Sequence, residues 1–428
     1  MRDVFLLLWF AISMPIAFFR PFYGIVVFTI LAFNRTQDLC WGVARDLRLS
    51  QLIALVTLVG FVLNHKGKYF ISDKRNWLLI LLFLWVGVSV YTAYYPSAAI
   101  TKYPEMGKVI LVASLTSCLL TTQKRFRTLM FVTSLSLGFY SIKNALIGTT
   151  VNRGPGGLLQ DNNDFSSALV MALPMLYYIA IDEKTRWKKA FFFFASLCTV
   201  VTVTLTDSRG GFLAMATVFF ALVMMSNKKL LAFSSIPIVV AAFFLFAPQR
   251  YIDRISSISD TQEASSKGRL VAWANGLRMI KDRPITGVGY RNFVYVYHFY
   301  TIDKTEQRRV AHNSYVQVAA ESGLPAFFIF MTLIGYTIYR LRAVRKTVRG
   351  SPGAEWVVNY SRALEASIYG YMMGAMFLNR AHFDLYYHVV AMSVALDVLA
   401  REHLAKAHAP APAAPAAASP MLLPEPAT

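Results

Sequence analysis

His312 combines a side chain and a position that suit acid–base chemistry. It stands at the start of a predicted short helix, close after Arg308 and Arg309. The positive end of a helix and two basic neighbours should lower the pKa of the imidazole, and a neutral imidazole is a natural general base near pH 7. A histidine that only caps the helix would show the same pattern. Glu321 should lie on roughly the opposite helix face and is not an obvious partner.

Arg209 lies in a polar break between two apolar runs, with the sequence Thr206-Asp207-Ser208-Arg209-Gly210-Gly211. The planar guanidinium group can hold a phosphate through two parallel hydrogen bonds, and glycine lets the backbone approach a ligand closely. The segment therefore suits a phosphate. A simple turn in which Asp207 pairs with Arg209 is the alternative.

Another arginine, Arg269, lies near the start of a helix that we predict over residues 266–283. Four apolar residues of this helix recur at three- and four-residue spacing: Leu270, Trp273, Leu277 and Ile280. This spacing gives the helix one apolar face. We expect the helix to lie flat on the protein or on the membrane interface, with Arg269 directed at whatever lies there.

The loop over residues 152–164 contains Asp161 and Asp164, with Asn162 and Asn163 between them. Paired carboxylates can bind a hard cation, but no third carboxylate is close in the sequence. A loop that contacts substrate or is flexible is the favoured interpretation, and we predict no metal.

Motifs of several other protein classes do not occur in the sequence. Gly287-Val288-Gly289 has no preceding predicted strand and no third glycine, so we predict a tight turn and no dinucleotide site. GxxxxGK[ST], HExxH and GxSxG do not occur, which leaves ATP-driven transport, zinc proteolysis and serine hydrolysis without support. The three cysteines are far apart and predict neither a disulfide framework nor a zinc site.

The composition indicates that membrane helices position these residues. Of the 428 residues, 56% are hydrophobic and 15% are charged, whereas a soluble domain carries about 25% charged residues. A soluble protein of this length could not bury so much apolar surface, so we predict an all-α polytopic membrane protein. Its first apolar run is expected to be a retained membrane segment and not a cleaved signal.

Apolar runs long enough to be membrane helices occur throughout the chain, since a spanning helix needs about 20 residues. They cover residues 4–19, 22–34, 49–64, 77–95, 106–121, 126–147, 165–181, 189–206, 211–225, 230–246, 324–341, 363–379 and 384–400. The first two flank Arg20-Pro21 and are either two short helices or one kinked crossing. One crossing gives about twelve helices with both termini inside, which we favour.

Ionisable residues also flank or interrupt the apolar runs: Arg20, Arg380, His382, Asp384 and His388. Such groups at membrane depth are functional candidates by default. A position at the membrane interface is a sufficient explanation for Arg20 and for Arg380.

Basic residues set the orientation of the helices. They cluster at residues 66–75, 124–127, 184–189, 228–229, 340–349 and 401–406. These clusters fall at alternate ends of the predicted helices, so the positive-inside rule places them in the cytoplasm. Residues 150–164, 207–210 and 247–323 then lie outside. The excess of basic residues in the loop 247–323 fits either a solvated surface or a site for an anionic substrate.

The chain therefore divides into four predicted parts. They are an N-terminal transmembrane bundle (1–246), a long external loop (247–323), C-terminal transmembrane helices (324–406) and a disordered, Ala/Pro-rich cytoplasmic tail (407–428). We find no internal repeat, which argues against transporter folds built from inverted repeats.

In this order, the motifs resemble the O-antigen ligase/polymerase superfamily of bacterial envelope glycosyltransferases (WaaL/Wzy type). The matching stretches are Ser208-Arg209-Gly210, Gly268-Arg269 through Trp273 to Pro284, Gly287-Val288-Gly289, and His312-Asn313-Ser314-Tyr315 with Glu321-Ser322-Gly323. Residues 1–59 and 161–165 further resemble the branch of exosortase-associated O-glycosylation ligases. The resemblance covers nearly the whole chain except the tail.

The resemblance implies a GT-C-like, metal-independent glycosyltransferase of the bacterial inner membrane, with its active site facing the periplasm. It also implies that the loop 247–323 is periplasmic and contains the catalytic helices. Its donor would be an undecaprenyl-diphosphate-linked glycan and its acceptor, for a ligase, a sugar hydroxyl of lipid A-core. His312 would be the general base. Arg209 and Arg269, with Arg291 as a third candidate, would hold the diphosphate. The resemblance implies no cofactor, and the charge of the chain requires no nucleic acid partner.

Several alternatives remain open from the sequence. An O-antigen or exopolysaccharide polymerase, or a protein O-glycosylation ligase, would use the same donor with another acceptor. A lipid-linked glycan flippase would bind the same diphosphate without chemistry, but transporter sites favour the membrane midplane, whereas the basic residues here gather outside. A protein that serves only as a structural scaffold is the last alternative, and it would not explain why Arg209, Arg269 and His312 occur together.

Overall fold

The computed structural model describes residues 1–64, 66–67, 70–151, 153–156, 159–226, 264–303 and 306–407. Some predicted features lie outside these residues. They are the basic pair 228–229, the apolar run 230–246 with the boundary at its end, residues 247–263 of the long loop, and the tail from residue 408 onward.

The described residues form helices and contain no β-strand. The N-terminal elements are α1 (Arg2–Phe19), α2 (Pro21–Thr29), the π-helical turn η1 (Ile30–Asn34), the 3-10 turn η2 (Thr36–Leu39), α3 (Val43–Asp46) and α4 (Leu49–Asn64). The middle of the chain forms α5 (Lys74–Tyr91), α6 (Pro96–Leu119), α7 (Gln123–Ile147), α8 (Asn162–Asp182), α9 (Arg186–Leu205) and α10 (Arg209–Met225). The remaining helices are α13 (Ala264–Asp282), α14 (Phe293–Tyr300), α15 (Ser314–Thr347), α16 (Glu355–Ala375) and α17 (Asp384–Ala407).

Six described helices are long and apolar enough to cross a membrane: α1, α5, α7, α8, α9 and α15. The prediction of an all-α membrane protein is therefore confirmed, whereas the count of twelve spans stays a prediction. At Arg20 the backbone leaves the helical region, and Pro21 begins α2, so the first two apolar runs form two separate helices.

Helix α8 forms the centre of the bundle and packs against α7, α9, α10 and α16. Small residues allow this close packing. A Cβ atom added to Gly211 of α10 would clash with the Ser166 side chain, and one added to Gly374 of α16 would clash with the Ser167 side chain. In membranes, where the hydrophobic effect does not drive helices together, such close contact supplies much of the association energy.

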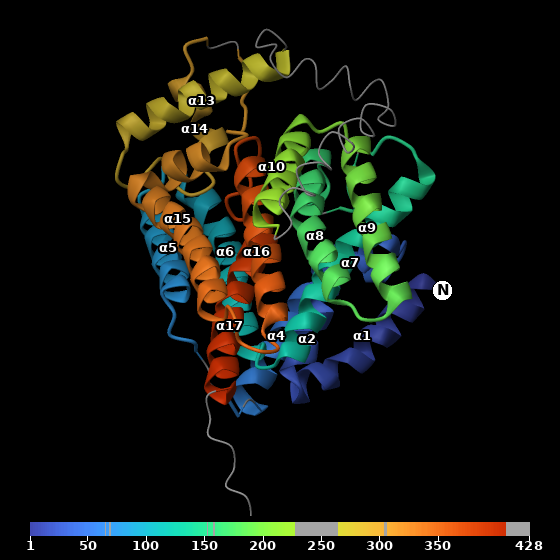
Figure 1. The fold of residues 1–428 in the computed structure, drawn as a ribbon. Helices are drawn as coiled ribbons and strands as arrows, with labels where there is room; N and C mark the ends of the chain where they lie inside the picture. The colour runs from blue at the N-terminus through green and yellow to red at the C-terminus, as the bar shows by residue number, and fades with distance from the viewer. Residues whose placement is uncertain are drawn as a thin grey trace, which may run out of the picture.

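Several of the predicted cytoplasmic clusters meet at one end of the bundle. Asp397 of α17 forms ion pairs with Arg75 (2.9 Å), Arg340 (2.6 Å) and Arg401 (3.2 Å), each from a different basic cluster. Figure 1 shows α13 and α14 across the opposite end of the bundle, away from the end of α17. The meeting of these basic clusters at one end agrees with the prediction that the clusters lie at alternate ends of successive helices.

Helix α13 confirms the helix predicted over residues 266–283, but it packs on the protein through an unexpected face. Its buried positions are Gly268, Ala272, Asn275, Gly276 and Met279. Two residues of the predicted apolar face, Leu270 and Leu277, are 47% and 61% exposed. Small side chains on the buried face let the helix backbone approach its neighbours closely, and this advantage is not visible in a hydropathy pattern.

Candidate functional site

At the end of the bundle that carries α13 and α14, three helices, α8, α10 and α15, begin with a polar side chain that caps them. The caps are Asp161 for α8, Ser208 for α10 and Asn313 for α15. Each side-chain oxygen accepts a hydrogen bond from a backbone N–H of the first turn, at 2.9, 3.0 and 2.9 Å respectively. The remaining free N–H groups and the helix dipoles make each start partially positive.

Hydrogen bonds join the starts of α8 and α10 directly. The Ser208 hydroxyl donates to Asn163 Oδ1 at 2.8 Å, and Asn162 Nδ2 donates to the carbonyl of Thr206 at 2.9 Å. The predicted substrate loop and the arginine-containing break at 206–211 are therefore one structural unit. Arg209 is the first residue of α10, so its position follows from this unit.

The connection between α16 and α17 joins the start of α15 to the other two. The Ser314 hydroxyl donates to the carbonyl of Leu378 at 2.8 Å and accepts from the backbone N–H of Arg380 at 2.9 Å. The Arg380 guanidinium forms an ion pair with Asp164 of α8. Phe377 packs on Gly210 at the start of α10. All three helix starts therefore lie around one connection.

His312 lies directly before the cap of α15, at the edge of this group. Its side chain is exposed, and its electrostatic neighbours include Arg269, Asp161 and Arg309. Partial loss of water around the ring, together with the positive charge of Arg269, lowers the pKa of His312. The direction is the one predicted from the sequence. The cap itself is Asn313, so the alternative in which His312 caps the helix is wrong.

Arg269 is brought to His312 by the packing of α13. The indole Nε1 of Trp273 donates to the carbonyl of Ala311 at 2.9 Å, next to the histidine. Gly268 leaves room for the side chain of Arg309, which a Cβ atom would displace. In the pair Gly268-Arg269, the glycine thus lets Arg309 approach the backbone of α13 closely, and the arginine places a positive charge near His312.

Arg291 has a different environment. Its guanidinium lies 5.7 Å from the ring centre of Tyr290. The carboxylate of Glu321 lies near the same guanidinium and accepts the backbone N–H of Arg291. The sequence analysis did not anticipate that Glu321 would have this partner.

The Gly287-Val288-Gly289 segment is a tight turn, as predicted. The backbone φ angles of Gly287 and Gly289 are 68° and 111°, which favour glycine. Val288 N–H donates to the carbonyl of Ala320 at 2.9 Å. The turn therefore holds the start of α15 in place.

Backbone strain accompanies three of these segments. Among the described non-glycine residues with positive φ are Asp207 (53°), Arg291 (57°) and His312 (46°). Left-handed conformations of such residues carry a free-energy cost and persist only where the surroundings impose them, often at functional sites. Arg291 and His312 are predicted site residues, and Asp207 lies two residues before Arg209.

Residues 194–331 match the family described as O-antigen ligase. This stretch is an O-antigen ligase domain. The match supports the O-antigen ligase/polymerase superfamily, as the sequence resemblance predicted, and with it an enzyme of the glycosyltransferase-like ligase or polymerase type. Residues 1–165 match a family of unknown function. A comparison with curated proteins gives no match.

The O-antigen ligase domain contains Arg209, Arg269, Arg291 and His312, but it does not complete the site alone. Asn162 and Asn163, which hydrogen-bond the segment at the start of α10, and Asp161, whose charge acts on the imidazole, precede it in the chain. Arg380, which pairs with Asp164, follows it. The site is therefore assembled from the O-antigen ligase domain and both flanking regions.

Asp164 and Arg380 form a contact that the sequence analysis missed. Asp161 and Asp164 suggested a cation site, yet Asp161 caps α8 and Asp164 binds a guanidinium. An ionisable residue at the end of an apolar run was the available signal for Arg380, and a position at the membrane interface explained it equally well. The partners are too far apart in sequence for any local pattern to pair them.

Proposed function

We propose that the protein is an O-antigen ligase that transfers a glycan from undecaprenyl diphosphate to a sugar hydroxyl of lipid A-core at the periplasmic face of the inner membrane. The observation that carries the proposal is the position of His312, a histidine of lowered pKa, beside three joined helix starts. A general base and an anion-binding surface are the two parts that glycan transfer from a lipid diphosphate requires.

In the proposed step, His312 accepts the proton of the acceptor hydroxyl. The acceptor oxygen forms a bond to the anomeric carbon of the first donor sugar while the bond to the diphosphate oxygen breaks, and the configuration inverts. Undecaprenyl diphosphate leaves with the electron pair of the broken bond. A neutral imidazole is required at the outset, and the lowered pKa of His312 keeps it neutral near pH 7.

Arg209 and Arg269 hold the diphosphate and stabilise the charge that develops as it leaves. Arg209 stands at the start of α10, so its guanidinium acts together with the free N–H groups of that helix. Such preorganised donors act most strongly where charge develops in the transition state. Arg291, held beside Tyr290 and Glu321, is the third candidate for binding the diphosphate.

Purified protein in lipid nanodiscs tests the proposal when it is supplied with lipid-linked glycan and lipid A-core. We expect joined product from the wild type, and a rate lower by about 10²–10⁴-fold from His312→Ala, because general-base catalysis contributes about that much. His403→Ala is the matched control, since His403 bonds the carbonyl of Pro352, remote in sequence from the proposed site. Wild-type turnover by His312→Ala would remove His312 from the mechanism.

A deletion strain separates the ligase from its close alternatives. Loss of glycan-capped core with retention of long lipid-linked chains indicates a ligase, whereas a core capped by a single repeat indicates a polymerase. Transfer of glycan to protein in the purified assay would indicate a protein O-glycosylation ligase. Movement of donor across vesicles without any product would indicate a flippase and overturn the proposal.

A further inference from the structure

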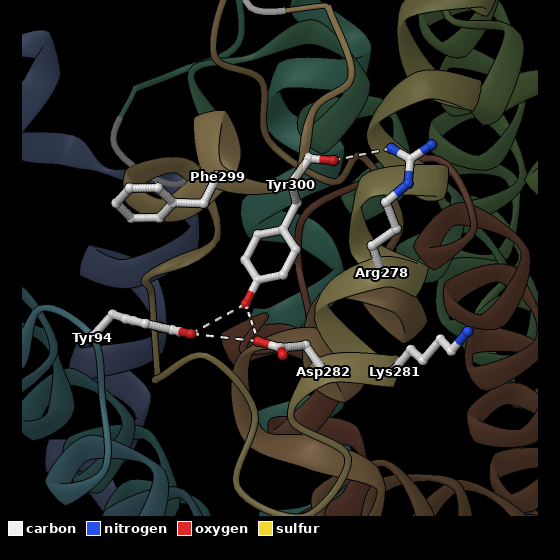
Figure 2. A pocket seen from close by; sticks show the side chains of 6 residues that line it. All are labelled: Tyr94, Arg278, Lys281, Asp282, Phe299 and Tyr300. Atoms are coloured by element: carbon white, nitrogen blue, oxygen red, sulfur yellow. Dashed lines mark hydrogen bonds between the residues drawn. The ribbon is translucent and has the colours of Figure 1, made fainter.

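A groove lies at the far end of α13, between this helix, α14 and the connection from α5 to α6. It encloses about 590 Å³ and is lined by Tyr94, Arg278, Lys281, Asp282, Phe299 and Tyr300. Figure 2 shows the hydroxyl groups of Tyr94 and Tyr300 pointing at the carboxylate of Asp282, with the Phe299 ring beside them.

The polar groups of the groove are held in place. Asp282 Oδ2 accepts hydrogen bonds from Tyr300 at 2.6 Å and from Tyr94 at 3.4 Å. Among the described residues, Asp282 Oδ1 has no hydrogen-bond partner, and a carboxylate can accept several more hydrogen bonds. Arg278 donates to the carbonyl of Tyr300 at 3.0 Å and fixes the end of α14. The groove therefore presents an oriented acceptor that does not need to reorganise for a ligand.

Aromatic side chains form the rest of the groove. Phe299 is 54% exposed and Tyr94 is 41% exposed, and their ring centres lie 6.3 Å apart. A sugar ring matches such a surface, because its C–H face packs on an aromatic ring while its hydroxyl groups donate to a carboxylate. A phosphate would be attracted by Arg278 and Lys281 but repelled by Asp282, and it would leave the aromatic surface without a partner. An apolar ligand would leave the carboxylate without partners.

The groove and His312 are linked by one straight element. Arg269, the neighbour of His312, and Asp282, in the groove, lie on the same helix, α13. The rise of an α-helix places them about 20 Å apart. A glycan that reacts at His312 would have to extend over several sugar residues to reach the groove.

We propose that the groove is a carbohydrate subsite, which holds a sugar of an extended glycan several residues away from the reacting end. The proposal rests on the proposed glycan transfer, and it adds a second point at which the enzyme binds its glycan. The bound sugar belongs either to the donor glycan or to the acceptor core, which share this chemistry.

Binding of lipid-free oligosaccharides tests the subsite without catalysis. One probe is the core oligosaccharide released from the organism's lipopolysaccharide, and the other is the glycan released from its lipid-linked donor. We expect saturation-transfer NMR with the intact protein in nanodiscs to detect binding of one of them. Asp282→Ala removes a hydrogen bond to a charged group and Phe299→Ala removes an aromatic packing surface, so each should raise Kd about tenfold.

Matched variants control for general damage. Leu277→Ala truncates an exposed apolar side chain on the same helix as Asp282 and should bind like the wild type. Tyr300→Phe keeps the ring and removes the hydroxyl group, so it should weaken binding even if Asp282→Ala unfolds the protein. The melting temperature of each variant is measured in parallel.

Transfer kinetics identify the source of the bound sugar. The groove variants should raise KM about tenfold for the donor or for the acceptor and leave kcat within about twofold, because the groove is remote from the reacting bond. Absence of binding by the wild type, or unchanged Kd and KM in the variants, overturns the subsite. Binding that the variants weaken, in a protein that never forms joined product, would keep the subsite and overturn the proposed reaction.

Discussion

His312 adopts a left-handed backbone conformation that local sequence does not favour. The conformation has a consequence for chemistry, since the following residue, Asn313, supplies the helix cap. The imidazole therefore does not cap the helix. It remains exposed, next to Arg269 and Arg309. A base for an incoming hydroxyl must be both accessible and neutral, and this arrangement provides both conditions.

The pH dependence of transfer should report the state of His312. The neutral ring is the active form and predominates above its pKa, which is lowered from the ordinary value near 6.5. Wild-type kcat/KM should therefore stay constant down to about pH 6.5 and fall only at more acidic pH. The residual rate of His312→Ala should lack this acid limb. An identical acid limb in both proteins would assign it to another group.

Arg209 should contribute through the geometry of its guanidinium as well as its charge. We expect Arg209→Ala to raise the donor KM or lower kcat so that kcat/KM falls at least tenfold, and Arg209→Lys to restore only part of the loss, since lysine cannot form two parallel bonds. Steady-state kinetics at varied donor concentration measure the effect. Arg349→Ala, at an exposed arginine near the end of α15, is the control. Full activity of Arg209→Lys would show that Arg209 contributes only its positive charge and not the geometry of its guanidinium group.

At the scale of helices, the site depends on three starts that are fixed to one another. Asn163 contacts Ser208, and Ser314 contacts Leu378, so a shift of α8, α10 or α15 would move the site residues. The close contact of α10 with α8 at Gly211 is a sensitive point, because Gly211 lies only two residues after Arg209 on the same helix.

Gly211→Ala should therefore destabilise the protein and lower its activity. The new Cβ atom would clash with the Ser166 side chain and force the helices apart, at a cost of about 1–3 kcal/mol. Gly335→Ala is the matched control. It adds the same atom within α15, where the described residues place no heavy atom within 4 Å apart from the chain neighbours and the backbone of the helix itself, and alanine favours a helix over glycine. Thermal unfolding in detergent compares the two; equal melting temperatures would show that α10 moves without cost.

At the scale of the whole molecule, the two ends of the bundle differ in chemistry. One end contains the ion pairs of Asp397 with arginines from three basic clusters. The other end contains α13, α14 and the candidate site (Figure 1). The positive-inside rule then predicts that the end with the basic clusters faces the cytoplasm.

Cysteine labelling tests this orientation. The native cysteines Cys40, Cys118 and Cys198 are buried, so the wild type should react little with a membrane-impermeant maleimide. Leu277→Cys, on the exposed face of α13, should be labelled in spheroplasts, whereas Arg349→Cys should be labelled only after lysis. The reverse pattern would invert the topology and place the proposed site in the cytoplasm, without access to a periplasmic acceptor.

The amino-acid sequence by itself determined the class of protein, the positions of the described apolar helices, the helix predicted over residues 266–283 and the turn at Gly287-Val288-Gly289. These features depend on composition and on short-range periodicity, and both can be read from the amino-acid sequence of one protein. It also singled out residue types that suit the proposed chemistry, because His312 and Arg209 stand at breaks between helices and Arg269 lies in the second turn of α13.

Only the tertiary structure decided which of these residues meet. The pairing of Asp164 with Arg380 joins distant segments, and the contact of Arg291 with Glu321 joins a turn to α15. The buried face of α13 was also decided by packing, since Gly268 and Gly276 admit neighbouring side chains that the more apolar Leu270 and Leu277 would exclude. Close approach and long-range pairing depend on three-dimensional fit, whereas hydropathy records only the preference of each residue for water or lipid.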